Sequence, residues 1–146
     1  EEILSTIILA VIDVQNKKTD ILIVGDGLVV INDNIFEFEN DNKPDYIGYH
    51  LNSDKETWYE EKTTKLSFTK VSNLVISTDG IFTFKNFDGK NYPNITQDEI
   101  NQKFFTDQND MDNPKKLFKS LLNLKDEYGL LPSDDLSMIR IILDLT

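Results

Sequence analysis

The sequence predicts one α+β domain built in layers over residues 1–146, and three observations support this prediction. The length of 146 residues is typical of a single domain with one hydrophobic core. Apolar runs with the character of strands dominate the first part of the chain, and helical patterns with start and stop signals dominate the later part. Strands that precede grouped helices are typical of an α+β domain.

Polar turns separate the strands expected near the start of the chain. Antiparallel strands are predicted over residues 6–13, 20–24, 28–31 and 35–38. The polar segment 15–19 is expected to close the first hairpin. The Asn-Asp-Asn segment 32–34 is expected to close the second, because Asn and Asp tolerate left-handed backbone geometry. Residues 40–65 lack a clear period and are expected to form a long loop with a helical turn near Trp58.

Three helices are expected in the second half of the chain. A short one is expected to begin at Gly80, after a tight turn. The capping-box signature at Thr96 predicts a second helix over residues 97–105. The third is predicted to start at Asn113 as N-cap, because a proline follows it, and to stop at Gly129 after apolar residues at helical spacing.

Two short acidic segments, far apart in sequence, adjoin apolar strands. The run 73–77 is expected to be a buried strand that ends at Asp79, where Gly80 lets the backbone turn. Asp134 and Asp135 precede another apolar strand. Carboxylates at the ends of core strands are held rigidly, and hard divalent cations select oxygen ligands. Asp79 and Asp134 are therefore predicted to bind one metal ion, with their carboxylates within about 6 Å of each other.

Each of these aspartates also has a plainer interpretation. Asp79, which precedes Gly80, has the pattern of a turn former or a helix N-cap. Asp134 and Asp135 are compatible with an ordinary loop, and Asp26, between two glycines, is compatible with a tight turn. The sequence alone leaves these alternatives open.

Five short elements occur in an order that points to a known family. They are Ser5-Thr6-Ile7-Ile8-Leu9-Ala10-Val11, Val24-Gly25-Asp26-Gly27, Asp41-Asn42-Lys43-Pro44, Ser77-Thr78-Asp79-Gly80 and Asp134-Asp135-Leu136-Ser137. In this order they resemble the motifs of the metal-dependent Ser/Thr protein phosphatases of the PP2C family. Each motif is weak alone, but five in the family's order are much more specific. The resemblance covers essentially the whole chain.

The resemblance implies a layered β-sandwich of antiparallel strands flanked by helices. It also implies hydrolysis of phosphate monoesters on phosphorylated protein substrates by a metal-activated water. Asp79 and Asp134 would bind one Mg²⁺ or Mn²⁺ of a binuclear centre. Asp26, Gly80 and Asp135 are candidates for accessory roles, and no catalytic residue is implied beyond the metal ligands.

In the family, a segment before the Ser-Thr strand supplies an Asp-Gly motif whose aspartate bridges the two metal ions. The sequence begins at Glu1, almost directly at that strand, so the resemblance implies the C-terminal portion of a phosphatase domain and an incomplete fold. The isolated chain is then expected to bind Mn²⁺ weakly and to be inactive. Its exposed strand edges are expected to pair with the missing N-terminal segment or to drive self-association.

Four positions depart from the family pattern: Gly27, Asn42, Thr83 and Asp135. Many members have an aspartate where this chain has Thr83, and that aspartate helps to hold a third metal ion. These departures leave a second function open, in which the chain is a catalytically inactive regulatory or binding module with the same fold.

Composition excludes several other functions. A net charge of −11 opposes binding to nucleic acid or to anionic membranes. The absence of cysteine excludes thiol chemistry, and His50, the only histidine, has no spaced partner that would make it a ligand. The longest apolar run, residues 6–12, is too short to span a bilayer. A cytoplasmic location is the default expectation.

Overall fold

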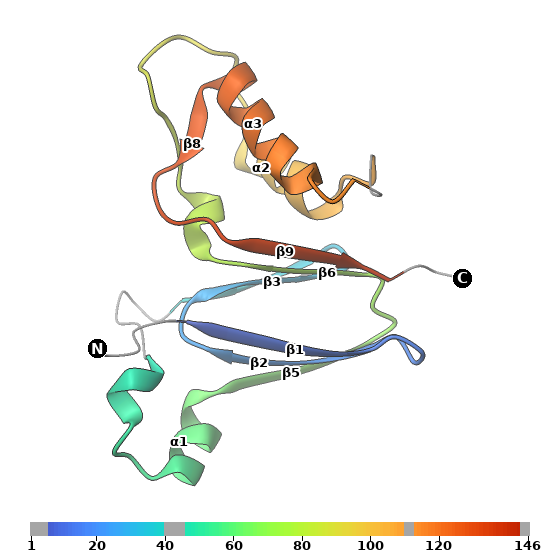
Figure 1. The fold of residues 1–146 in the computed structure, drawn as a ribbon, viewed down its shortest axis with the longest axis vertical. Coiled ribbons are helices and arrows are strands. Elements are labelled where there is room, and N and C mark those ends of the chain that lie inside the picture. Colours follow the sequence, from blue (N-terminus) through green and yellow to red (C-terminus); the bar gives the residue numbers. More distant parts are fainter. Residues whose placement is uncertain (1–5, 40–45, 110–112, 144–146) are drawn as a thin grey trace. The chain divides into compact units, whose positions relative to one another are not determined.

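The structure of the chain, a computed structural model, describes residues 6–39, 46–109 and 113–143 (Figure 1). The predicted Asp41-Asn42-Lys43-Pro44 element lies outside the described residues. The chain divides into two compact units, one formed by Glu1–Ile76 with Ile141–Thr146 and the other by Ser77–Arg140. The expectation of a single domain over residues 1–146 stays a prediction.

Two β-sheets confirm the predicted α+β sandwich (Figure 1). The first has the strand order β1-β2-β5 and contains β1 (Ile7–Asp13), β2 (Lys18–Val24) and β5 (Thr64–Thr69). The second has the order β4-β3-β6-β9 and contains β3 (Gly27–Ile31), β4 (Asn34–Phe38), β6 (Asn73–Ser77) and β9 (Met138–Ile142). The pairs β1–β2 and β3–β4 are antiparallel, as the hairpin signals in the sequence predict, and β2–β5 is antiparallel as well, although no signal in the sequence predicts that pair.

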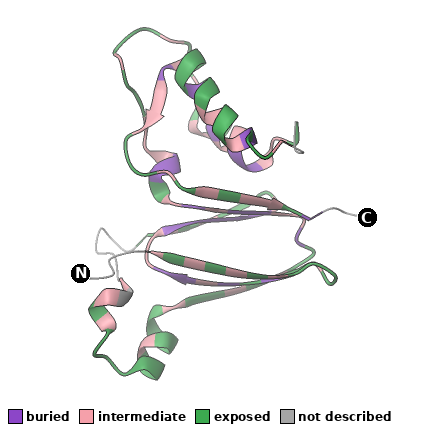
Figure 2. Cartoon of the chain, viewed as in Figure 1, coloured by how far each residue is buried: buried purple, intermediate pink, exposed green. Residues whose placement is uncertain are grey.

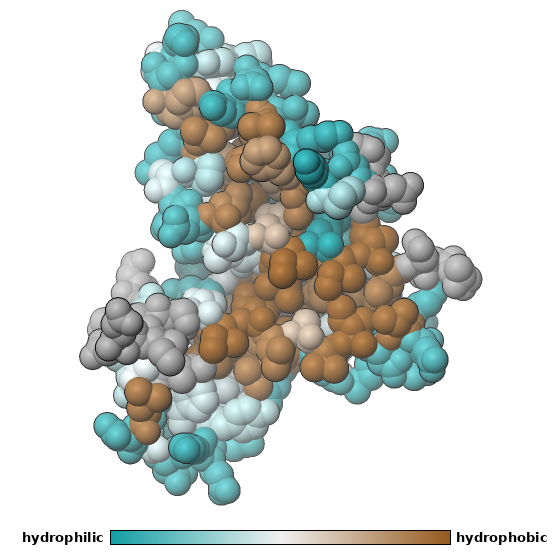
Figure 3. Space-filling view, in the orientation of Figure 1, coloured by the Kyte–Doolittle hydropathy of each residue, from teal (hydrophilic) through white to brown (hydrophobic). Residues whose placement is uncertain are grey.

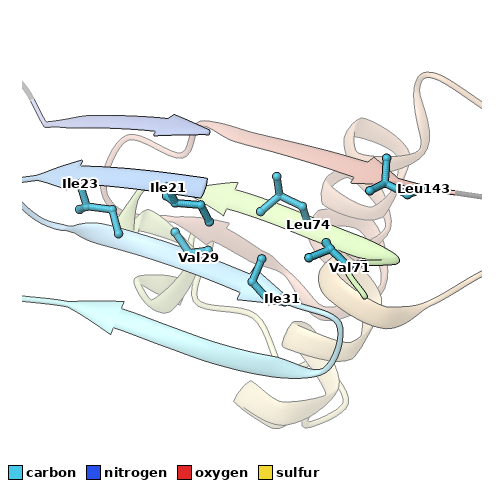
Figure 4. Close-up of a cluster of buried hydrophobic side chains, with 7 residues drawn as sticks. All are labelled: Ile21, Ile23, Val29, Ile31, Val71, Leu74 and Leu143. Atoms are coloured by element: carbon cyan, nitrogen blue, oxygen red, sulfur yellow. The ribbon is translucent and has the colours of Figure 1, made fainter. Parts of the chain in front are cut away.

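Apolar side chains from both sheets form the core of the first unit (Figure 4). The buried cluster consists of Ile21, Ile23, Val29, Ile31, Val71, Leu74 and Leu143. All five residues of β3 are buried, whereas β1 alternates between exposed and half-buried positions (Figure 2). Such alternation is expected of a strand that packs one face on a core. The hydrophobic effect therefore holds the two sheets together face to face.

Left-handed residues close both hairpins of the first unit. Lys17 has a φ of 51° in the first hairpin and Asn32 has a φ of 55° in the second, which confirms the turn expected over 32–34. The side-chain Oδ1 of Asn32 also accepts a hydrogen bond from the backbone N–H of Ser72 at 2.9 Å. The second hairpin is thereby fastened to the segment that leads into β6.

The segment over residues 40–65 has the helical turn expected near Trp58, because a helix contains that residue, but its described part is more regular than the long loop predicted there, and that part of the prediction was wrong. It includes η1 (Ile47–His50), α1 (Lys55–Lys62) and the start of β5. Asp54 caps α1, because its side chain accepts a hydrogen bond from Thr57 N at 2.9 Å. Only Leu66 and Phe68 of β5 are apolar, and pairing with the distant β2 decides that they form a strand.

The second unit combines helices with a short β-ladder. Its elements are η2 (Asp79–Phe82), β7 (Phe84–Asn86), α2 (Gln97–Asn101), η3 (Gln102–Thr106), α3 (Lys116–Tyr128) and β8 (Leu130–Pro132). The helix expected from Gly80 is only the 3₁₀ turn η2, because the chain then pairs as β7 with β8. The residues buried to 3 % exposure or less include Ile81, Ile100, Phe104, Phe105 and Leu124.

The helix starts of the second unit follow the sequence signals in one case and not in the other. Thr96 and Glu99 form the predicted capping box, with Glu99 N donating to Thr96 Oγ1 at 3.2 Å and Thr96 N donating to Glu99 Oε2 at 2.7 Å. Asn113 is not the N-cap of α3. Its Oδ1 accepts a hydrogen bond from Lys115 N at 2.9 Å and closes a turn before the helix.

None of the described helices has the length and apolar content needed to cross a membrane.

Glycine at position 129 is required at the end of α3 for two reasons. Gly129 has a φ of 64°, in the left-handed region, and a Cβ built there would lie 2.2 Å from a ring carbon of Tyr92. Gly89 has a similar φ of 70°, but a Cβ there would meet nothing within 4 Å. An alanine would therefore be strained in its backbone at both positions, but it would overlap a neighbouring side chain only at position 129.

We expect Gly129→Ala to destabilise the protein more than Gly89→Ala. Both variants incur the left-handed strain of about 1–2 kcal/mol. Only Gly129→Ala adds an overlap with Tyr92, which costs about 1–3 kcal/mol more. Urea unfolding of the two variants and the wild type measures the difference. Equal losses of stability would show that Tyr92 does not press against position 129.

Candidate metal centre

The two acidic segments singled out in the sequence form two turns of the second unit. The first acidic turn, residues 78–83, contains η2 and places Asp79 at its first helical position, exposed to solvent. The second acidic turn, residues 133–137, connects β8 to β9 (Figure 1) and contains Asp134 and Asp135, which are also exposed.

Backbone hydrogen bonds join the two acidic turns at both ends. Thr78 N donates to Ser137 O at 3.0 Å, and Ser133 N donates to Thr83 O at 3.0 Å. The side-chain hydroxyl of Ser133 donates to the same Thr83 carbonyl at 2.9 Å. Segments fifty or more residues apart in sequence are thereby held directly against each other.

The hydroxyl of Thr78 adds two more hydrogen bonds across this junction. Thr78 Oγ1 donates to the carbonyl oxygen of Asp135 at 2.8 Å and accepts from Ser137 N at 3.0 Å. A single side chain before Asp79 thus contacts backbone groups on both sides of Leu136. The C-terminal half of the second acidic turn is fixed relative to the residue that precedes Asp79.

The hydroxyl of Thr83 holds the N-terminal half of the second acidic turn. Thr83 Oγ1 accepts hydrogen bonds from Ser133 N and from Asp134 N, each at 3.2 Å. The same hydroxyl donates to Gly80 O at 2.9 Å, within the first acidic turn. The amide of Asp134 is therefore tied to the turn that carries Asp79.

Gly80 permits this close approach. A Cβ at position 80 would lie 2.5 Å from the carbonyl oxygen of Asp135 and 3.2 Å from Leu136 Cα. Contacts below 3.0 Å require something to move, and here the neighbour is backbone. Glycine is needed at this position chiefly because the second acidic turn passes so close to it.

The exposed carboxylates on these turns match hard divalent cations in ligand type. Asp134 Oδ1 accepts a hydrogen bond from Asp135 N at 2.7 Å, which orients that carboxylate relative to its own turn. In the described part of the chain, no group of three or more His, Asp or Glu side chains is placed to hold a metal ion. The two turns thus offer carboxylates from Asp79 and Asp134, and a complete coordination shell needs water or other ligands. That these two carboxylates come within about 6 Å of each other stays a prediction.

Asp26 and His50 belong to the other compact unit. Asp26 lies between Gly25, with a φ of 87°, and Gly27, with a φ of 154°, in the turn between β2 and β3. An accessory role for Asp26 at the metal centre stays a prediction. The half-buried His50 packs against Trp58, with 5.8 Å between the ring centroids.

A second polar cluster, in the unit formed by Ser77–Arg140, is explained by hydrogen bonds to carbonyl groups at the end of η3. Lys116 Nζ and Arg140 donate to the carbonyl oxygen of Asp107 at 2.6 Å and 2.8 Å. The hydrogen bond from the backbone N–H of Asn109 is the main reason that the pKa of Asp107 lies below its ordinary value. The hydrogen bond and the positive charge of Lys116 lower this pKa further. These cations satisfy carbonyls at a helix terminus.

The sequence does not reveal the role of two residues in the candidate centre. Thr78 stands there only as part of a motif, and Thr83 only as a departure from the family pattern. The usable signal was a hydroxyl side chain on each side of Asp79-Gly80, since such side chains frequently hydrogen-bond to backbone groups in turns.

Comparison with protein families matches residues 1–126 to the family described as Protein phosphatase 2C. The chain belongs to the protein phosphatase 2C family. The matched span includes Asp79 with the first acidic turn, and it ends before Asp134. Membership confirms the resemblance that the ordered motifs indicate.

Two solved structures resemble this protein phosphatase 2C chain. Both are of the phosphatase domain of the cell fate determinant SpoIIE from Bacillus subtilis, one of them presoaked with Mn. The first has 17% sequence identity and a TM-score of 0.48, and the match covers 97% of this chain and 60% of the SpoIIE chain. The presoaked structure has 16% identity and a TM-score of 0.49, with 97% and 58% covered. The chain thus spans less than two thirds of these domains. No curated protein matched it.

We expect Gly80→Ala to separate the two acidic turns. The added Cβ overlaps the Asp135 carbonyl, so the variant must lose about 1–3 kcal/mol or move that backbone. Amide hydrogen exchange should accelerate at Thr78 and Ser137, whose N–H groups cross the junction. Amides of the β1–β2 hairpin, in the other unit, serve as the internal control. Unchanged exchange at Thr78 and Ser137 would contradict the close approach.

Proposed function

We propose that the chain is part of a metal-dependent phosphoprotein phosphatase domain, which acts on phosphorylated Ser or Thr. In this proposal Asp79 and Asp134 bind one Mg²⁺ or Mn²⁺ of a binuclear centre. Its main support is the junction of the two acidic turns, which holds two carboxylate-bearing segments against each other. Family membership adds independent support, because it rests on residues 1–126 rather than on this geometry.

In this mechanism the chain's own residues would bind the metal ion and orient the carboxylates that hold it. A bound Mg²⁺ or Mn²⁺ would supply the chemistry, because it would lower the pKa of coordinated water and neutralise phosphoryl oxygens. Asp79 and Asp134 provide the anionic oxygen donors that such cations prefer. Gly80 lets the turns meet, and the hydrogen bond from Asp135 N orients the Asp134 carboxylate.

We expect Asp79→Asn and Asp134→Asn each to weaken Mn²⁺ binding at least about tenfold, because each removes an anionic ligand at constant size. Electron paramagnetic resonance of free Mn²⁺ in a titration of the chain measures the affinity. Asp126→Asn changes another exposed carboxylate, on α3; it is the control and should bind Mn²⁺ as the wild type does. If the Asp79 and Asp126 variants bind equally well, the proposed metal centre is wrong.

The chain alone should turn over a chromogenic phosphate ester far below about 1 per second.

An inactive regulatory or binding module is the second candidate function. One observation favours it: Thr83, which replaces the aspartate of many family members, has its hydroxyl engaged with backbone groups. A module of this kind would bind a phosphoserine peptide without hydrolysing it. Mn²⁺-dependent release of phosphate from such a peptide distinguishes the phosphatase from the module.

The edge of the first sheet is proposed to pair with another strand. In the described residues β1 ends the order β1-β2-β5, and an edge strand presents unpaired backbone groups. Ile7, Leu9 and Val11 of β1 are 37%, 56% and 63% exposed. Figure 3 shows apolar side chains gathered over the strands. Either the rest of the phosphatase domain covers this edge or the chain associates with itself through it.

Self-association through β1 is tested by light scattering. We expect the wild-type chain to form oligomers and Val11→Lys to reduce them, because a lysine on an edge strand opposes pairing. Val14→Lys makes the same chemical change at 64% exposure, against 63% for Val11, but in the turn after β1. It should leave the association unchanged. A monodisperse wild-type monomer would contradict self-association and the need for a covering segment.

A further inference from the structure

We propose that Thr83 and Thr78 are positioning residues of the metal centre, and this inference rests on the proposed role of Asp79 and Asp134. In this proposal neither threonine is a metal ligand. Each holds backbone of the second acidic turn against the first, so that the carboxylate of Asp134 is presented at a fixed place.

The hydroxyl of Thr83 has no remaining capacity to bind a cation. A threonine hydroxyl offers one donor and two acceptor lone pairs. The donor is directed to Gly80 O at 2.9 Å, and the two acceptor positions receive Ser133 N and Asp134 N at 3.2 Å each. Thr83 therefore acts through the amide of Asp134, and it does not replace the family's aspartate as a metal ligand.

Thr78 also affects the carboxylate of Asp134, through a different set of hydrogen bonds. Its hydroxyl donates to Asp135 O at 2.8 Å, which fixes the peptide that follows Asp135. Asp135 N in turn donates to Asp134 Oδ1 at 2.7 Å. The sequence of contacts thus runs from the residue before Asp79, through Asp135, to the carboxylate of Asp134.

Together the two hydroxyls hold the second acidic turn at both ends. Thr83 holds the amides at positions 133 and 134, and Thr78 holds the carbonyl at 135 and the amide at 137. Groups that orient metal ligands affect metal affinity strongly, and their loss typically costs about 10–100-fold. Loss of either hydroxyl should therefore lower metal affinity while both carboxylates remain.

The test compares Thr83→Val, which keeps the shape and removes the hydroxyl, with Thr83→Ser, which restores it. We expect Thr83→Val to weaken Mn²⁺ binding about tenfold or more and Thr83→Ser to bind close to the wild-type affinity. A second readout needs no metal: hydrogen exchange at the Ser133 and Asp134 amides should accelerate in Thr83→Val and not in Thr83→Ser. Thr106→Val removes a hydroxyl that donates within η3, to Gln102 O at 3.4 Å, and is the control.

The outcomes separate this inference from the proposed function. If the wild type binds no Mn²⁺, both are overturned. If Asp79→Asn abolishes binding while Thr83→Val binds as tightly as Thr83→Ser, the positioning role alone is overturned. Circular dichroism checks that Thr83→Val is folded. If it is not, Thr78→Val takes its place, with the same affinity measurement and with exchange read at Ser137.

Discussion

The close contact between the Asp79-Gly80 turn and the segment from Ser133 to Ser137 is the constraint on which the candidate centre depends. Without a Cβ at Gly80, the Asp135 carbonyl occupies space that any other side chain would need. Hydroxyls on either side of this contact then bond to backbone groups of the opposing turn. Steric complementarity and hydrogen bonding act together here, so two exposed loops gain the rigidity that metal ligands require.

The hydrophobic core gives the strands of the sandwich a fixed framework. Leu74 of β6 is buried in the cluster that includes Val29 of β3 and Ile21 of β2. Along the chain, β6 leads directly into the first acidic turn. Rigid strands with functional residues on the adjoining loops are a common arrangement in enzymes.

Family membership and local geometry support the proposed phosphatase function in different ways. The family match covers residues 1–126, so it includes Asp79 and not Asp134. The hydrogen bonds at Thr78 and Thr83 connect the matched part of the chain to the segment that carries Asp134. The chain spans 60% of the length of a SpoIIE phosphatase domain, so the activity of the whole protein remains a proposal. Thr83 is relevant to both candidate functions, the phosphatase and the inactive module, because its hydroxyl forms hydrogen bonds that join the two acidic turns.

The sequence by itself determined the family, the α+β class and those elements whose signals are local. The capping box at Thr96 and the stop at Gly129 belong to this group, because a few neighbouring residues suffice to form them. The sequence also singled out Asp79 and Asp134, but it could not show what holds their turns together. Tertiary structure decided that β5 is a strand, because its backbone pairs with β2. It also decided that η2 stays a single 3₁₀ turn, because the residues that follow it pair as β7 with β8. It also decided the roles of Thr78 and Thr83, whose partners on the second acidic turn lie fifty or more residues away, where no local pattern can show them.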